Sequence, residues 1–226
     1  MKPIVSIIIP TRNAEKFVGQ CLESINNQSF RDFEVIIVDG QSTDNTLEVA
    51  HASANFQLVE QTGTGLAAAW NQGIQASQGA YISFIDSDDW FEPDSLAQHM
   101  QQLLSQPEID YSIGHVKYFA ENANKLPYGF KPSLLNGIHH ALMPGCFVGK
   151  RALFSKVGFF DESLIVATDI QWFHDLKISH ASSIDLNVQV LNKRIHANNL
   201  SYTTSETSVY NKELLAVVRR RLRLGS

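Results

Sequence analysis

The amino-acid sequence predicts an α/β fold, with a mostly parallel central sheet flanked by helices. Residues 1–106 alternate short apolar runs with segments in which apolar residues recur every three or four positions. The apolar runs are rich in Val and Ile and show no polar alternation, which is typical of strands covered on both faces. Strands that alternate with helices in this order form βαβ units, and such units build a parallel sheet.

Four strands and four helices are expected in this part of the chain. The apolar runs that predict strands cover residues 4–9, 33–38, 56–60 and 81–85. The segments with helical spacing cover residues 17–25, 47–54, 66–74 and 93–103. Turn-forming residues stand between them, including the glycines Gly63 and Gly65 before the third helix.

The pattern changes after about residue 107. Residues 120–137 are rich in Asn, Pro and Gly and are expected to form a loop, whereas residues 184–190 alternate apolar with polar side chains, as in a half-exposed strand. A basic helix is expected in the tail, residues 201–226. Because there is no internal repeat and no long linker, we expect one domain over residues 1–226, with a smaller β portion in its second half.

Composition excludes several classes of protein. A formal net charge of −5 over 226 residues gives no basis for binding nucleic acid. Cys21 and Cys146 are too few for a disulfide framework. The apolar N-terminal run is too short for a signal sequence, and no segment approaches the roughly 20 apolar residues that span a bilayer. We therefore expect a cytoplasmic protein.

Three of the expected strands end in polar segments, PTRN, DGQSTD and DSDD. Ligands of parallel sheets collect beyond the carboxyl ends of the strands, so Asp39, Asp86 and Asp88 are expected at one crevice. Carboxylates this close repel one another and need a positive partner. Oxygen ligands suit Mg²⁺ or Mn²⁺, which would also hold a diphosphate. For the short DSDD segment alone, a hydrated acidic turn or helix cap is the alternative interpretation.

The ordered segments VSIIIPTRN, VIIVDGQSTDNT and AAWNQGIQASQGAYISFIDSDDWFEPDSL resemble the family 2 glycosyltransferases of the GT-A fold. The resemblance is close over residues 3 to about 100 and weaker to about 200. It implies an inverting enzyme that moves a sugar from a nucleotide diphosphate to a hydroxyl group. Residues 1–106 would then bind the nucleotide-sugar donor, and residues 107–200 would supply the acceptor site and the catalytic base. UDP-sugars are the favoured donors, with guanosine and thymidine donors open.

The resemblance also implies roles for residues after the first two strands. Pro10, Thr11 and Arg12 match the loop under the nucleoside base, and Asp39 matches the acid that accepts a hydrogen bond from the base. A main-chain turn can hold a planar ring, and a carboxylate at a strand end accepts a ring N–H well. The alternative for Asp39 is a cap on the turn that follows it, and for Arg12 a plain surface position.

After the fourth strand, Asp86 matches the first acid of the family's Asp-x-Asp motif, near the ribose, and Asp88 matches the second, which binds the metal. Ser87 between them is expected at the nucleotide-sugar site. Gly65 and Asn71 match the glycine turn and helix before this motif, where binding and packing roles are equally open.

The segment GFFDESLIVATDIQWFHDL resembles the family's stretch in which an acidic pair opens a helix. Thr168 stands where a glutamate is more usual, so Asp169 is the expected catalytic base, with Thr168 as the helix cap. An inverting transfer needs one carboxylate to deprotonate the incoming hydroxyl, and a helix N-terminus favours the ionised acid. The alternative is a helix acid that interacts only with the helix dipole.

The segment RIHANNLSY resembles a late histidine segment of the family, so His196 is expected to complete the metal site with Asp88. Imidazole suits Mn²⁺ better than Mg²⁺, and the alternative is a structural histidine. GIHHALMPGCFVGKRALFSKVG resembles the acceptor side, where His140 or Gly145 could line the pocket. For the histidine, an ordinary loop position is the alternative.

The resemblance implies transfer of a single sugar, because the Gln-x-x-Arg-Trp segment of polymerising members is absent from the sequence. A glycan or lipid-linked acceptor of cell-surface polysaccharide synthesis is expected. The terminal RRRLRLGS could touch the anionic inner face of the membrane; a solvated or dimer-forming tail is the alternative. A catalytically inactive sugar-nucleotide binding protein is the second candidate function. A dinucleotide-binding oxidoreductase is excluded, since no Gly-x-Gly-x-x-Gly follows the first strand.

Overall fold

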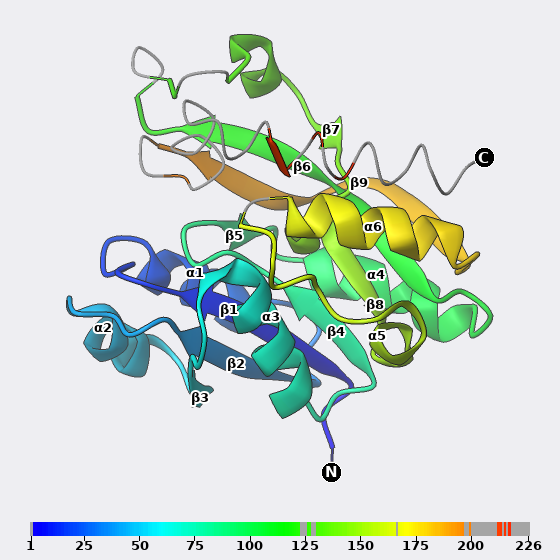
Figure 1. Ribbon diagram of the computed structural model, residues 1–226, viewed down its shortest axis with the longest axis horizontal. Coiled ribbons are helices and arrows are strands. Elements are labelled where there is room, and N and C mark those ends of the chain that lie inside the picture. The colour runs from blue at the N-terminus through cyan, green and yellow to red at the C-terminus, as the bar shows by residue number, and fades with distance from the viewer. Residues whose placement is uncertain are drawn as a thin grey trace.

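The computed structural model describes residues 2–122, 126–127, 130–165, 167–196, 199, 212–213, 215 and 217. Within them one sheet of nine strands runs through the molecule in the order β3-β2-β1-β4-β8-β6-β9-β5, with β7 beside β6. Helices flank this sheet, and β1, β2 and β3 lie at the opposite end from β6 and β9 (Figure 1). The α/β fold with a mostly parallel sheet in its first half is confirmed.

The first half contains the expected parallel strands and the helices between them. The strands are β1 (Val5–Thr11), β2 (Phe33–Asp39), β3 (Gln57–Glu60) and β4 (Tyr81–Phe84). The helices are α1 (Val18–Asn26), α2 (Thr46–Ser53), α3 (Gly65–Ala76) and α4 (Ser95–Ser105). Every residue of β1 is buried, because β1 lies between β2 and β4 and is covered on both faces. All eight predicted elements of this half are therefore present.

The second half completes the sheet with mixed pairing. Its strands are β6 (Tyr111–Ala120), β7 (His139–His140), β8 (Phe147–Lys150) and β9 (Ser183–Ile195), and the short β5 (Trp90–Phe91) of the first half pairs antiparallel with β9. Its helices are α5 (Ala152–Val157) and α6 (Thr168–Ile178), with short 3₁₀ turns at Pro132–Leu135 and Pro144–Cys146. β8 pairs antiparallel with both β4 and β6, whereas β9 runs parallel to β6. The predicted strand at 184–190 is the first part of the longer β9.

An aromatic cluster joins the two halves of the chain. Phe84 of β4 contacts Phe147 of β8 and Phe154 of α5, at centroid distances of 6.5 and 6.0 Å. Trp172 of α6 stacks on Phe154 at 4.9 Å, and its indole N–H donates to the Gly158 carbonyl at 2.9 Å. Aromatic pairs at these distances stabilise a core beyond their area burial. The packing fixes α6, and hence Asp169 in its first turn, against the sheet.

Most of the tail lies outside the described residues, so the predicted basic helix and its membrane contact stay predictions. Lys212, Glu213, Leu215 and Val217 are helical, and Val217 is buried. Among the described residues, none of the helices combines the length and the apolar character needed to cross a lipid bilayer.

Candidate active site

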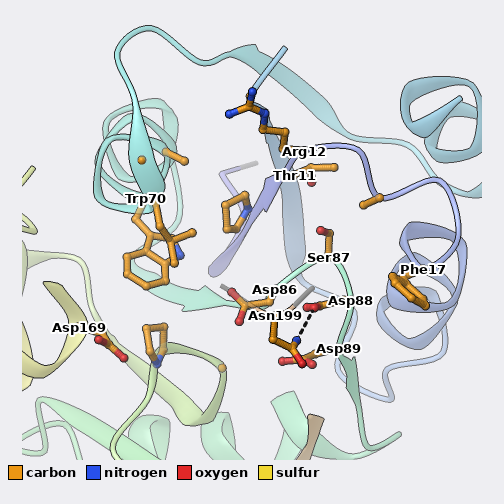
Figure 2. A pocket seen from close by; sticks show the side chains of 18 of the residues that line it. Thr11, Arg12, Phe17, Trp70, Asp86, Ser87, Asp88, Asp89, Asp169 and Asn199 are labelled. Atoms are coloured by element: carbon orange, nitrogen blue, oxygen red, sulfur yellow. Dashed lines mark hydrogen bonds between the residues drawn. The ribbon is translucent and has the colours of Figure 1, made fainter. Parts of the chain in front are cut away.

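A cavity of about 740 Å³ opens at the carboxyl ends of β1 and β4. The first half contributes the PTRN segment after β1, the glycine turn before α3 and the DSDD segment after β4. The second half contributes Met143 to Gly145, the start of α6 and the end of β9. Figure 2 shows Arg12 and Thr11 on one side of this cavity and Asp169 on another, with Asp86 between Asp169 and Asp88. The predicted crevice therefore exists and has walls from both halves.

The glycine turn before α3 needs its glycines for a conformational reason. Gly63 has φ of +82° and Gly65, the first residue of α3, has φ of +88°. Side chains with a Cβ rarely adopt such angles. Gly65 also lines the cavity, so the turn places main-chain atoms, without a side chain to cover them, at the edge of the site.

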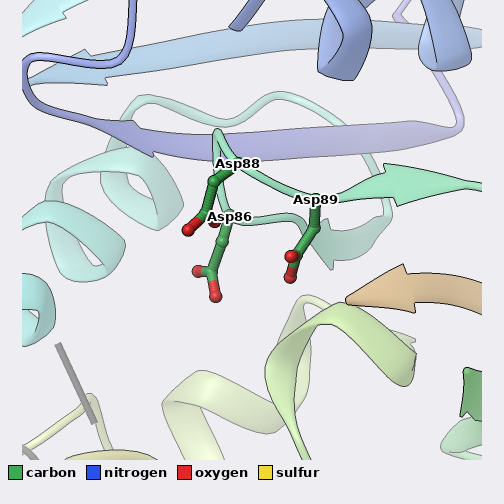
Figure 3. A group of neighbouring side chains, drawn as sticks. All are labelled: Asp86, Asp88 and Asp89. Carbon is green, nitrogen blue, oxygen red and sulfur yellow. The ribbon is translucent and has the colours of Figure 1, made fainter. Parts of the chain in front are cut away.

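Asp86, Asp88 and Asp89 form the acidic cluster of the site. Each offers a carboxylate oxygen, and these oxygens all lie within 4.8 Å of one another. Figure 3 shows the three side chains directed to the same side of the loop after β4. Three hard oxygen ligands in this arrangement suit Mg²⁺ or Mn²⁺.

The positive partner that the clustered carboxylates require is Lys193 of β9. Its ammonium nitrogen lies 2.9 Å from Asp86 Oδ2 and 3.0 Å from Asp89 Oδ2. Sequence reasoning missed this residue and did not place Asp89 in the site. Lys193 stands three residues before His196, and that spacing was the only signal in the sequence that could have pointed to it.

Burial and mutual charge set the protonation of this group. Burial raises the pKa of Asp89, although the charge of Lys193 acts in the opposite direction. Burial alone would lower the pKa of Lys193, but the charges of Asp89, Asp86 and Asp88 outweigh it and raise that pKa well above its ordinary value. Lys193 therefore keeps its charge, and Asp89 is the carboxylate that takes up a proton most readily as the pH falls.

The two predicted metal ligands, Asp88 and His196, lie together although 108 positions separate them. His196 Nε2 is 2.9 Å from Asp88 Oδ2, and Asn199 Nδ2 donates to the same oxygen at 3.1 Å. Burial alone would raise the pKa of Asp88, but the hydrogen bond from His196 and the charge of Lys193 lower it. The imidazole also stacks on Phe17 at a centroid distance of 5.0 Å. The three carboxylates lie close enough together to share a divalent cation, and the imidazole lies beside one of them, Asp88.

Arg194 holds the end of β9 against the acidic loop. Its backbone N–H donates to Asp89 Oδ1 at 2.8 Å, and its Nε donates to the Asp88 carbonyl at 2.9 Å. The guanidinium also lies over two rings, 4.7 Å from the centroid of Phe17 and 5.0 Å from that of Trp90. A planar cation with several donors can make all these contacts at once. Arg194 therefore fixes the position of both the acidic loop and the segment that carries His196.

Asp169 lies in the first turn of α6 and faces the cavity. Burial raises its pKa to about 6; the Ile170 backbone hydrogen bond opposes this rise, and the negative charge of Asp86 adds to it. The expected cap by Thr168 is wrong: α6 begins at Thr168, Ala167 occupies the cap position, and no side chain caps the helix. The Thr168 hydroxyl is buried without a hydrogen-bond partner in the described part of the chain.

The backbone before α6 is held from the far end of the chain. Glu213 accepts hydrogen bonds from the N–H groups of Ile165, at 2.8 Å, and Ala167, at 3.3 Å. These two residues lead directly into the turn that carries Asp169. The C-terminal segment thus supports the backbone next to the expected base.

Most of the predicted site residues line the cavity, and three do not. Those that line it are Pro10, Thr11, Arg12, Gly65, Asp86, Ser87, Asp88, Gly145, Asp169 and His196. Asp39 instead accepts hydrogen bonds from the Ser42 backbone N–H at 2.9 Å and the Ser42 hydroxyl at 2.6 Å. This is the turn-capping arrangement that was the alternative for Asp39.

Asn71 and His140 also have other partners. Asn71 pairs with the Phe160 backbone through two hydrogen bonds of 3.0 Å and donates to Glu162 at 2.8 Å. It thereby joins α3 to the loop before α6, as the packing alternative requires. His140 lies 3.4 Å from Asp185 in a group with His115. Sequence reasoning also missed Phe17, because its helical spacing indicated only a packing role.

Comparison with known proteins identifies relatives of this chain. The chain is 31% identical over 211 residues to an uncharacterized glycosyltransferase, RP339, of Rickettsia prowazekii (strain Madrid E), covering 86% of this chain and 65% of that protein. It is 36% identical over 111 residues to the hyaluronan synthase of Pasteurella multocida, covering 47% of this chain and 11% of the synthase. The chain thus spans less than two thirds of the length of these relatives.

Solved structures share the fold. TarS of S. aureus (residues 1–349) in complex with UDP superposes with a TM-score of 0.66 at 25% identity, covering 86% of this chain and 60% of that one. Glucosyl-3-phosphoglycerate synthase from Mycobacterium tuberculosis, in complex with Mn²⁺, UDP and phosphoglyceric acid, superposes with a TM-score of 0.65 at 20% identity, covering 97% of this chain and 78% of that one. Both confirm the expected GT-A fold.

The family itself follows from the sequence comparison. The profile described as Glycosyl transferase family 2 matches residues 6–164, which include the PTRN segment, the whole acidic cluster and the residues that lead to α6. The chain belongs to glycosyl transferase family 2.

Proposed function

We propose that this protein is an inverting glycosyltransferase that moves one sugar from a nucleotide diphosphate sugar, with a UDP-sugar as donor, to a hydroxyl group. The single observation that carries this proposal is the shared cavity: the acidic cluster and Asp169 face the same 740 Å³ space. One side can hold a diphosphate through a cation, and the other offers a carboxylate to an incoming hydroxyl.

Residues at the carboxyl ends of the strands bind the donor in this proposal. Arg12 and the backbone of Pro10 and Thr11 line the part of the cavity that would hold the nucleoside, and Asp86 and Ser87 lie where the ribose and diphosphate would follow. The UDP and UDP-GlcNAc complexes of TarS support a uridine donor. Asp39 accepts one hydrogen bond from Ser42 at each of its two carboxylate oxygens, and each oxygen has a second lone pair with which it could accept the N–H of the base.

Asp88 and His196 would hold a divalent cation, Mn²⁺ or Mg²⁺, and the Mn²⁺ and Mg²⁺ complexes of the mycobacterial synthase support this assignment. The cation, when bound, supplies positive charge that stabilises the leaving diphosphate. Asp88 now accepts hydrogen bonds from both His196 and Asn199. The Asn199 amide orients the carboxylate, as partners of metal-binding side chains commonly do. His196 would have to exchange its Nε2 contact with Asp88 for the cation in order to bind it.

Asp169 accepts the proton of the acceptor hydroxyl in this proposal. Its pKa of about 6 is close to the pH at which the protein would work, and a base is most effective there. A carboxylate that is ionised yet poorly solvated takes a proton more readily than an exposed one. Asp86 adds to this effect because its negative charge disfavours a second charge nearby.

Single-sugar transfer to a glycan or lipid-linked acceptor, in the synthesis of a cell-surface polysaccharide, remains part of the proposal. Its support is the absence of a Gln-x-x-Arg-Trp segment in the sequence. The acceptor side of the cavity carries Tyr118, Met143 and Ile165, an apolar and aromatic set that can pack on a sugar ring or a lipid. The division into a donor half, an acceptor half and a tail is likewise a proposal.

The decisive experiment is a thermal-shift screen of nucleotide sugars with and without Mn²⁺, because a ligand that binds the folded protein stabilises it by mass action. We expect a UDP-sugar with Mn²⁺ to give the largest shift, followed by release of UDP when alcohol acceptors are added. If no nucleotide diphosphate shifts the melting temperature with any metal, the donor assignment is wrong. Binding without turnover over a broad acceptor panel would favour the sugar-nucleotide binding protein.

A further inference from the structure

Lys193 is the one lysine among the described residues that line the cavity. We propose that it is a further donor-binding residue, whose ammonium neutralises Asp86 and Asp89 and binds the diphosphate beside the divalent cation. This inference rests on the proposed function for the identity of the anion. It assigns a role to a side chain that the family resemblance did not indicate.

The contacts of the ammonium leave it able to bind an anion. A lysine ammonium has three N–H donors, and two of them are directed to Asp86 Oδ2 and Asp89 Oδ2. The side chain is 21% exposed and lines the cavity, so the third donor can be reached from the space that a diphosphate would fill. Charge-assisted hydrogen bonds of this kind are among the strong ones in proteins.

The contacts also divide the acidic cluster between two cations. Both oxygens of Asp89 are committed to the protein, since Oδ1 accepts the Arg194 N–H and Oδ2 accepts from Lys193. Its side chain is only 1% exposed. Asp88 lies on the other side, with His196 and Asn199. A divalent cation bound by Asp88 and His196 would therefore compete with Lys193 for Asp86.

The charge balance of the site explains why a cation at position 193 would favour binding of the diphosphate. With all three carboxylates ionised, as the N–H donors to both oxygens of Asp89 favour, the acidic cluster and one divalent cation would keep a net negative charge, which would repel the diphosphate. With the ammonium added, these groups become neutral before the anion arrives. In a poorly hydrated cavity this difference is large, because charges interact more strongly there than in water.

The first experiment compares UDP binding by calorimetry, with Mn²⁺ and with EDTA, in the wild-type protein, K193Q, K193R and K156Q. Lys156 is an exposed lysine of α5 outside the cavity, so K156Q controls for a general loss of positive charge. We expect K193Q to weaken UDP binding about 10- to 100-fold in Mn²⁺, K193R to retain most of the affinity, and K156Q to bind as the wild type does. In EDTA, the wild-type protein should bind UDP weakly and K193Q should show no binding.

The second experiment addresses folding, because K193Q leaves Asp89 buried without its ammonium partner. K193Q is therefore repeated in a D89N background, where that charge is removed, and thermal unfolding verifies that both variants fold. We expect D89N/K193Q to bind UDP at least tenfold more weakly than D89N. A titration of Mn²⁺ without nucleotide should show several-fold tighter binding in K193Q than in the wild type, since Lys193 no longer competes for Asp86.

The outcomes separate this inference from the proposed function. If the wild-type protein binds UDP and neither K193Q nor D89N/K193Q weakens that binding, Lys193 is only a structural counter-ion and the inference is wrong. If the wild-type protein binds no UDP under any condition, the proposed function fails. Inorganic pyrophosphate then serves as the probe: binding that needs Lys193 would retain the anion site, and no such binding would overturn it.

Discussion

The guanidinium of Arg194 lies 4.7 Å from the ring centroid of Phe17, and this contact joins the end of β9 to the residue before α1. The same guanidinium hydrogen-bonds the carbonyl of Asp88. A residue from the second half of the chain thus holds together the loop that precedes α1 and the acidic loop after β4. Substitution at this position should affect stability and donor binding together.

We expect R194K to lower the free energy of unfolding by about 2–4 kcal/mol, because lysine keeps the charge but loses the planar stacking and most of the donors. For a chain of this size the melting temperature should fall by roughly 2–4 °C per kcal/mol. Thermal unfolding at pH 7 checks the effect, with the surface variant K156Q as the control. A melting temperature within 1 °C of the wild type would show that Arg194 is not the anchor described here.

D169N should remove turnover and keep donor binding. Loss of a general base typically costs about 10²- to 10⁴-fold in rate, and Asn is close to Asp in size and can accept the same Ile170 hydrogen bond. UDP affinity by calorimetry should stay within a factor of about three, since Asp169 faces the acceptor side of the cavity. Unchanged turnover in D169N would exclude Asp169 as the base.

The same substitution should also stabilise the fold. Because the folded pKa of Asp169 is about 6 against an ordinary value of 3.8, burial favours the protonated form, and stability is lost as the pH rises from about 4 to 6. D169N removes this cost at pH 7 and above. Allowing for water in the cavity, we expect a gain of roughly 1 kcal/mol, or about 2–4 °C, that disappears near pH 4. Melting curves of both proteins over this pH range test the sign.

The rate of the wild-type enzyme should depend on pH through the same group. Below about pH 6, Asp169 is mostly protonated, so kcat should fall about tenfold for each further pH unit, and it should level off above pH 7. Steady-state rates from pH 4.5 to 8 at saturating substrate measure this. A rate that is constant down to pH 5 would mean that the base has an ordinary carboxyl pKa or is another residue.

The stability that His99 contributes should change with pH in the opposite direction to the contribution of Asp169. His99 does not line the cavity. It is 1% exposed in α4, its Nδ1 lies 2.7 Å from the Ser112 hydroxyl of β6, and burial lowers its pKa to about 3. The neutral ring is favoured in the fold, so its contribution is complete above pH 6.5 and is lost as the pH falls toward 3. The stability difference between wild type and H99Q should shrink by up to about 1.4 kcal/mol per pH unit below pH 6. A difference that is constant with pH would show that His99 titrates normally.

The sequence predicted the parts of this fold that local pattern controls. Strands β1, β2 and β4 are apolar runs that the chain buries completely or nearly so, and their carboxyl ends carry the PTRN and DSDD segments. The sequence could not show which side chains from β9 reach those ends. Lys193 is placed by the parallel pairing of β9 with β6, in which the register shifts at His115, and no local pattern predicts such a shift.

The sequence also could not show which hydrogen-bond partner each polar side chain has in the folded protein. Asp39 and Asn71 have the residue types and positions of binding groups, but each has polar neighbours that satisfy it in the folded chain, namely Ser42 and the Phe160 backbone. Asp88 and His196, by contrast, were expected at one site because each lies in a segment that resembles the family, and they do lie together.

The contact of Glu213 with the backbone at Ile165 spans 48 positions in the chain. A fused tag, a neighbouring subunit or a docking partner that displaces the distal segment would break this hydrogen bond and shift the turn that carries Asp169. Because Ile165 itself lines the cavity, this contact connects the distal segment directly to the wall of the site.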